Sequence, residues 1–198
     1  VVIATGGYGG NQKMLDRYLG KPNVKGEVQQ NVGDGLKMAW SAGTAKYGTQ
    51  TTHYFWEKFN DQEVKQLSKK MGQDYMALTT FTSYPILRVN INGQRFSNET
   101  DVTLYSVHGA EIAAQPKQTE YVILDQSMLN KIKAHGTAAI EQTYDKWQNN
   151  PQYFQEFNEP NDTKSMIKNE HKPTDFTPLL NKAAKTTAVT KANSIKEL

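Results

Sequence analysis

The chain opens with an apolar run, a cluster of glycines and an amphipathic segment. Residues 1–4 are apolar without alternation, a pattern typical of a strand that is buried on both faces of a parallel sheet. Glycine fills four of the positions from 6 to 10, and apolar residues then recur at helical spacing between Met14 and Leu19. This order predicts a strand, a glycine-rich turn and a helix.

Two more helices are predicted in the first half of the chain. Apolar residues gather between Leu36 and Ala42, after Gly33-Asp34-Gly35, so Asp34 is expected to cap a helix that Gly43 ends. The pattern from residue 47 to 81 is irregular, and within it only residues 62–71 favour a helix.

A hairpin is the clearest short-range prediction. Residues 86–90 and 94–96 have strand-like composition and flank Asn92-Gly93, a pair that tolerates the positive φ angles of a type I′ turn. We therefore expect two antiparallel strands joined by a tight turn.

The second half of the chain continues to mix helices and strands. Residues 103–114 read as a helix and 121–124 as a buried strand, and Asp125 is placed to cap a helix that ends near Gly136. The polar stretch 141–190 contains four prolines and fits short helical pieces on a surface. The fold class predicted is α+β.

Composition narrows the possible functions of the 198 residues. Lys and Arg number 23 against 20 Asp and Glu, and they are scattered, so nothing favours binding to nucleic acid. There is no cysteine, which excludes disulfides, thiolate catalysis and Cys-based metal sites. No apolar run approaches the roughly 20 residues of a membrane span, and no signal peptide is recognisable, so a soluble protein of undetermined compartment is expected.

Both ends of the chain suggest an internal fragment. A buried strand at residues 1–4 needs neighbouring strands from elsewhere, and the capping pair at 193–194 is followed by only about one helical turn.

The glycine turn offers one candidate ligand site. Thr5, Gly6 and Gly7 could let a phosphate or ribose approach the main chain ahead of a helix N-terminus, or they could simply form a tight connection. Asp34 has the same two interpretations, because its carboxylate can cap a helix or accept hydrogen bonds from cofactor hydroxyls.

Other candidate chemistry is sparse. The four histidines form no HxxxH or HxH pair, so no metal site is predicted. His53 lies in a polar, aromatic segment, where it either faces a substrate or lies at the surface. Nucleophilic hydrolysis has no GxSxG or SxxK motif. Arg95 and Glu99 could share a pocket or form an ordinary ion pair.

Five short motifs occur in the order found in one known family. In this order the chain resembles the flavoprotein subunit of the fumarate reductase and succinate dehydrogenase family, especially its flavocytochrome and urocanate-reductase-like branch. The motifs lie at residues 1–14, 33–43, 86–89, 93–99 and 121–125.

The resemblance implies an FAD-binding Rossmann-like domain that is interrupted by a mobile capping domain, with the substrate held between them. It places residues 1–48 in a strand-turn-helix segment of the FAD-binding domain and residues 49–198 in the capping domain. The turn at residues 5–7 and Asp34 would then contact FAD, and His53 would approach a substrate carboxylate. The GxGxxG fingerprint for the dinucleotide is absent from these residues.

The resemblance fails at the proton donor. The family's catalytic arginine lies eight residues after the arginine of the Arg-Phe-x-Asn-Glu motif, and here Thr103 holds that position. A hydroxyl is too weak an acid to replace a guanidinium and cannot clamp a dicarboxylate. Arg95 and Glu99 are therefore expected to shape a pocket, and efficient fumarate reduction is not expected.

The function predicted is hydride transfer between a flavin and an activated C=C bond of a small, carboxylate-type substrate. Its partners would be that substrate, the rest of the flavoprotein chain and an electron donor. Two alternatives stay open: a non-catalytic lid of a flavin electron-relay protein, and a nucleotide-binding α/β domain without a redox role.

Overall fold

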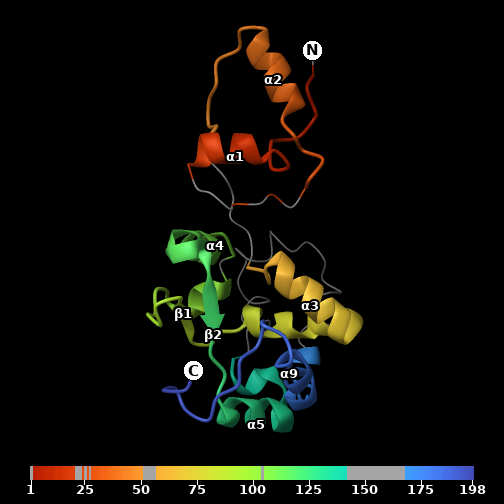
Figure 1. Cartoon of the computed structure of the whole chain (residues 1–198), viewed down its shortest axis with the longest axis vertical. Helices are drawn as coiled ribbons and strands as arrows, with labels where there is room; N and C mark the ends of the chain where they lie inside the picture. Colours follow the sequence, from red (N-terminus) through yellow and green to blue (C-terminus); the bar gives the residue numbers. More distant parts are fainter. Residues whose placement is uncertain are drawn as a thin grey trace. The chain divides into compact units, whose positions relative to one another are not determined.

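The computed structural model describes residues 2–20, 24, 26, 28–50, 57–103, 105–141 and 168–198, with the backbone alone at 83, 103 and 105. The chain divides into two compact units, Val1–His53 and Tyr54–Leu198 (Figure 1). The first is called unit 1 and the second unit 2.

Helix α1 (Gln12–Leu19) of unit 1 confirms the first predicted helix. The Asn11 side chain accepts a hydrogen bond from the Met14 N–H, and Gly20 ends the helix with a φ of 65°, a conformation that glycine adopts without strain. Met14 and Leu15 are its buried residues, as the apolar spacing requires.

Helix α2 (Asp34–Ser41) is also present, but the predicted cap is wrong. The N-cap is Gly33, with a φ of 80° and no side-chain hydrogen bond, and Asp34 is the first helical residue. The Asp34 carboxylate instead accepts a hydrogen bond from Lys37 Nζ at 2.9 Å and lies in the first turn, where negative charge is favourable.

The predicted opening strand is not found. Residues 2–5 have no regular secondary structure, and Val2 and Ile3 are 92% and 48% exposed. A strand must pair its N–H and C=O groups with a neighbour, and the described part of unit 1 contains no other strand.

Helix α3 (Asp61–Met71) confirms the third predicted helix and contributes to the first of two cores described in unit 2. Asn60 and Glu63 form a reciprocal capping box at its start. Leu67 and Met71 pack with residues of the 3₁₀ helix η1 (Gly72–Ser83) and of helix α9 (Thr177–Ala183). In Figure 1, α9 lies below α3, and both helices are on the right-hand side of unit 2.

The predicted hairpin is only partly correct. Strand β1 (Arg88–Asn90) pairs antiparallel with β2 (Glu120–Val122), with Val89 opposite Tyr121, and residues 94–96 form no strand. A tight turn does follow Asn90, but Asn92 lacks the positive φ of a type I′ turn. The Asn90 side chain instead accepts hydrogen bonds from the N–H groups of residues 92 and 94.

The segments around β2 follow the predicted order. The 3₁₀ helix η2 (Glu99–Thr103), α4 (Tyr105–Ala114), the short η3 (Pro116–Gln118) and β2 are followed by α5 (Gln126–His135) and η4 (Thr137–Ala139). Asp125 caps α5, since its carboxylate accepts from the Met128 N–H, and Gly136 ends it. Strand β2 is not fully buried, because it has one partner strand and Tyr121 is 54% exposed.

A second core lies beneath the sheet. It consists of the buried side chains Phe81, Tyr84, Ile86 and Ile132. The Phe81 ring packs against Phe176 with centroids 4.9 Å apart. This core joins the end of η1 and the segment before β1 to α5.

The last part of the chain is only partly described. Helix α9 bears out one of the helical pieces expected between residues 141 and 190, and residues 142–167 lie outside the description. The helical turn expected after the capping pair at 193–194 is not formed, and residues 191–198 contain only turns and bends. Among the described helices, none has the length and apolar character needed to cross a bilayer.

Candidate functional site

The glycine turn of unit 1 packs directly against the segment that leads into α2. The Gly33 N–H donates to the Gly7 carbonyl at 3.1 Å, and the Gly10 N–H donates to the Asn31 carbonyl at 2.8 Å. A Cβ atom at Gly35 would lie 2.1 Å from Thr5 Oγ1. A side chain at residue 35 would force the Thr5 side chain to move, and the structure brings the two predicted cofactor motifs together.

The residues at this contact are open to a ligand. Thr5, Gly6 and Gly7 are exposed, and a Cβ atom at Gly7 would meet no other atom within 4 Å. The Asp34 side chain is 68% exposed. This open main chain beside an accessible carboxylate fits a cofactor that approaches glycine backbone and presents hydroxyl groups.

An aromatic cluster fixes the rest of unit 1. The Tyr18 ring packs edge-on against Tyr8 and Trp40, with centroids 5.8 and 5.7 Å away, and Lys46 Nζ lies 4.7 Å from the Trp40 centroid. The Tyr8 hydroxyl also donates to the Thr49 carbonyl. Burial, with a smaller effect of Tyr18, raises the pKa of Tyr8.

Arg95 and Glu99 form an ion pair. This is one of the two arrangements that the sequence left open, the other being a shared pocket. Arg95 Nε and Nη2 donate to the two Glu99 oxygens at 2.8 and 2.5 Å. Arg95 is 62% exposed, whereas Glu99 is 16% exposed. The hydrogen bond to Arg95 is the main cause of the lowered pKa of Glu99. The Arg95 guanidinium and the Glu99 carboxylate are therefore paired with each other.

The structure gives little information on Thr103 and His53, the two other site residues predicted from the sequence. Thr103 ends η2, and its side chain is not described. His53 lies outside the described residues, so its approach to a substrate stays a prediction.

Sequence reasoning missed a buried polar cluster in unit 2 that is centred on Arg88. The Arg88 side chain is completely buried, and its Nη1 donates to the carbonyls of Tyr84 and Ile86 at 3.0 Å each. Its Nη2 donates to Thr82 at 3.0 Å and to Phe81 at 3.4 Å. One guanidinium thus satisfies four carbonyls where η1 leads into β1.

Glu120 links Arg88 to His108. Its Oε1 lies 3.4 Å from Arg88 Nε, and its Oε2 lies 3.3 Å from His108 Nε2. The strand register explains the first contact, because Asn90 is opposite Glu120 and Arg88 is its diagonal neighbour on the same face. His108 comes from α4 and is 2% exposed.

Two further carboxylates face His108. Glu111 Oε2 lies 3.6 Å from His108 Nδ1, and a Glu57 oxygen lies within 4.8 Å of both the His108 and the Glu120 ligand atoms. Burial is the main cause of the raised pKa of Glu57 and of Glu111. The one signal in the sequence was an arginine within the apolar run 86–89, because a charge on a predicted strand requires a partner.

Comparison with known proteins finds two related reductases. The chain is 31% identical to vinyl phenol reductase of Lactiplantibacillus plantarum over 139 residues, which are 69% of this chain and 27% of that protein. It is 29% identical to a probable fumarate reductase of Shewanella frigidimarina over 151 residues, 73% of this chain and 23% of that protein. The chain thus spans about a quarter of the length of either relative.

No family model and no solved structure matches the chain. Both relatives are named as reductases, so the chain has oxidoreductase relatives at low identity.

Proposed function

We propose that the chain is part of an FAD-dependent oxidoreductase that transfers hydride between the flavin and an activated C=C bond of a small molecule. Unit 1 contributes a segment of the FAD-binding domain, and unit 2 forms the α+β capping domain. The similarity to the two reductases carries this proposal, because vinyl phenol and fumarate both contain a C=C bond.

In this proposal unit 1 binds the cofactor through the main chain of residues 5–7 and the carboxylate of Asp34. The accessible surface of both supports this role. FAD supplies the hydride chemistry when bound, and the protein supplies orientation and exclusion of water.

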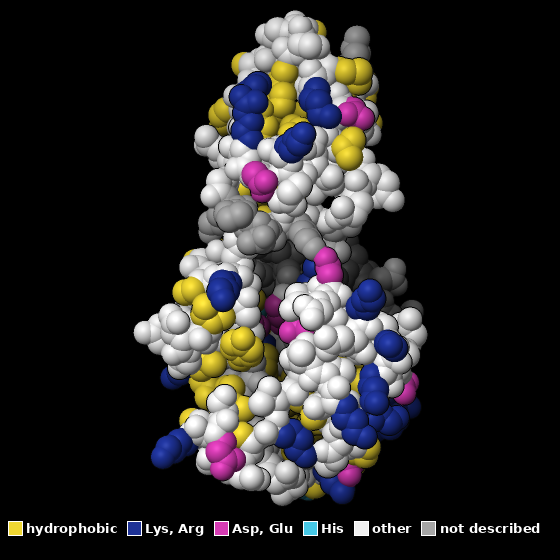
Figure 2. All heavy atoms as spheres, viewed as in Figure 1, with side chains coloured by type: hydrophobic (Ala, Val, Ile, Leu, Met, Phe, Trp, Pro, Cys, Tyr) yellow, Lys and Arg dark blue, Asp and Glu magenta, His cyan; other side chains and the backbone are white. Residues whose placement is uncertain are grey.

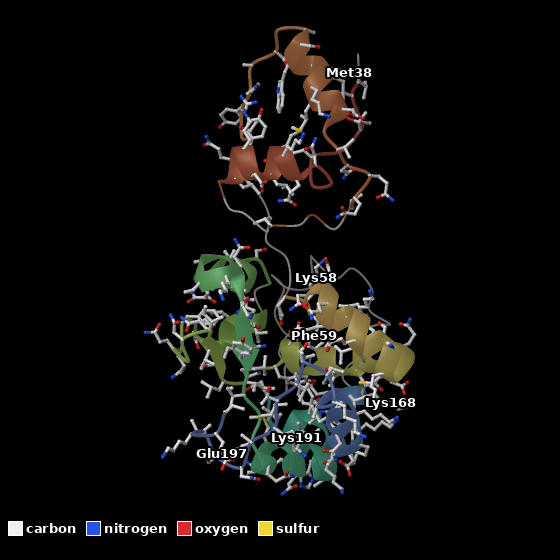
Figure 3. All side chains as sticks on the ribbon, viewed as in Figure 1. Met38, Lys58, Phe59, Lys168, Lys191 and Glu197 are labelled. Atoms are coloured by element: carbon white, nitrogen blue, oxygen red, sulfur yellow. The ribbon has the colours of Figure 1, made fainter. Side chains whose placement is uncertain are left out.

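The surface of unit 1 supports its place in a larger domain. Figure 2 shows apolar side chains on the outside of this unit, and Figure 3 shows Met38 on α2. Met38 is 58% exposed, Tyr47 99% and Val2 92%. Exposed apolar side chains in this number fit a face that packs against further protein.

The substrate class follows from Thr103. A guanidinium can bind a carboxylate through two parallel hydrogen bonds, which a threonine hydroxyl cannot do. Arg95 does not substitute for it, because Glu99 occupies its guanidinium. Within this proposal the two relatives therefore suggest a neutral alkene of the vinyl phenol kind more strongly than a dicarboxylate.

A non-catalytic lid of a flavin electron-relay protein is the second candidate. The loss of the arginine at position 103 favours it. Turnover of an alkene by the full-length protein with reduced viologen as electron donor separates the two candidates, because a relay protein would not consume the alkene.

Replacing Asp34 by alanine should weaken FAD binding to the full-length protein by roughly 1–3 kcal/mol, the usual contribution of a hydrogen bond to a charged group. Flavin dissociation followed by fluorescence measures the effect, with thermal melting as a check on folding. Lys37→Ala is the matched control, since it removes the ion-pair partner and keeps the carboxylate. Equal flavin affinity in Asp34→Ala and wild type would refute the cofactor role.

A further inference from the structure

Glu57, His108 and Glu120 reach one point in unit 2 from three separate parts of the chain. Their ligand atoms all lie within 4.8 Å of one another. Glu57 precedes α3, His108 belongs to α4, and Glu120 is the first residue of β2. Figure 3 labels Lys58 and Phe59, which directly follow Glu57, and Phe59 packs on the core formed with α3.

Several polar atoms of this cluster contact one another at 3.3–3.6 Å without forming well-aligned hydrogen bonds. Both His108 ring nitrogens, both Glu120 oxygens and Glu57 Oε1 are buried and accept or donate no hydrogen bond within the described structure. His108 is 2% exposed and the Glu120 side chain 7%. Buried polar groups are normally satisfied, so a group of them facing each other calls for an additional bound species.

The charges of the cluster indicate a cation. Glu57, Glu111 and Glu120 would carry three negative charges against one positive charge on Arg88, which leaves two negative charges when His108 is neutral. A divalent cation would neutralise this excess, which is costly in a buried site.

The donors are those of a transition-metal site. One imidazole and two carboxylates suit Zn²⁺ or Mn²⁺ better than Mg²⁺ or Ca²⁺, which prefer oxygen ligands alone. Glu111 faces His108 Nδ1, the nitrogen turned away from Glu120, as a carboxylate does behind a metal-bound histidine. Arg88 occupies only Oε1 of Glu120, so Oε2 faces the site.

We propose that Glu57, His108 and Glu120 bind one divalent transition-metal ion of the Zn²⁺ or Mn²⁺ class, with Glu111 orienting His108. The ion would link the segment before α3 to α4 and β2. Because the protein supplies three donor atoms, a tetrahedral ion would have one position left for a water ligand. The three donor atoms lie up to 4.8 Å from one another. When the ion binds, these distances must shorten to about 3.4 Å, the separation of donor atoms in a tetrahedral zinc site. This site was not expected from the sequence, because its ligands lie far apart along the chain.

Metal binding to the 198-residue chain tests the proposal directly. The chain is purified without a histidine tag, stripped with EDTA and titrated with ZnCl₂ or MnCl₂ alone, and bound metal is measured by equilibrium dialysis and elemental analysis. We expect about one ion per chain and a higher melting temperature with metal than without.

Variants assign the ion to this cluster. Glu57→Gln keeps the shape of a side chain that precedes α3, and it should lose at least 10- to 100-fold in metal affinity, the range found when even an outer-shell partner is removed. His108→Gln should lose binding altogether, with circular dichroism as a check on folding. His135→Gln removes an exposed histidine at the end of α5 and serves as the control. Less than one ion bound by the wild type, or a loss in Glu57→Gln below tenfold or equal to that of His135→Gln, would overturn the proposal.

Discussion

Replacing Arg88 by methionine should lower the free energy of unfolding by roughly 3–5 kcal/mol, the usual cost of removing one partner from a buried charge pair. The substitution removes the guanidinium donor from four carbonyls and leaves the Glu120 carboxylate buried without its cationic neighbour. Urea unfolding followed by circular dichroism measures the change.

Arg95→Met is the matched control for this prediction. It removes the same charge from an ion pair whose arginine is exposed, and it should lower the free energy of unfolding far less, because surface ion pairs contribute little to stability. Similar losses in the two variants would show that the buried network around Arg88 contributes nothing particular to stability.

The full-length protein should reduce fumarate roughly 10- to 100-fold more slowly than 4-vinylphenol, because fumarate needs a charged donor that hydrogen-bonds its carboxylates and the neutral alkene does not. The resemblance places Thr103 at the position of the family's arginine, and a threonine hydroxyl cannot bind a carboxylate through two parallel hydrogen bonds. Steady-state oxidation of reduced viologen with each substrate gives the ratio of kcat/KM.

The Thr103→Arg variant refines this prediction. It should gain only a trace of fumarate reduction, because the resemblance places Leu78, Thr79 and Thr82 at the positions of the family's upstream relay residues. Efficient fumarate reduction by the unmodified protein would show that the correspondence after Glu99 is wrong.

Local signals in the sequence predicted the helices well. Helices α1, α3 and α5 each begin at a residue whose side chain caps the first turn, and each ends at a glycine. Capping and apolar periodicity act over a few residues, so they can be recognised without knowledge of the fold.

Strand pairing and the buried cluster depended on distant residues. The partner of β1 lies some 30 residues away in β2, and after the turn that the Asn90 side chain stabilises residues 94–96 do not continue as a strand. The same pairing brings Glu120 to Arg88 and His108, so the polar cluster could not be predicted before the register was known. Asp34 was wrongly predicted to be the helix cap, and its contact with a cofactor stays a prediction.

Reoxidation of the reduced flavin by an alkene tests the central proposal most directly. The full-length protein is purified, its flavin is reduced under anaerobic conditions, and 4-vinylphenol is added while the absorption of the flavin is recorded. We predict that the oxidised flavin band returns as the alkene is consumed, because each C=C bond takes one hydride from the flavin and one proton. A protein without a flavin band, or a reduced flavin that 4-vinylphenol leaves reduced, would contradict the proposed function.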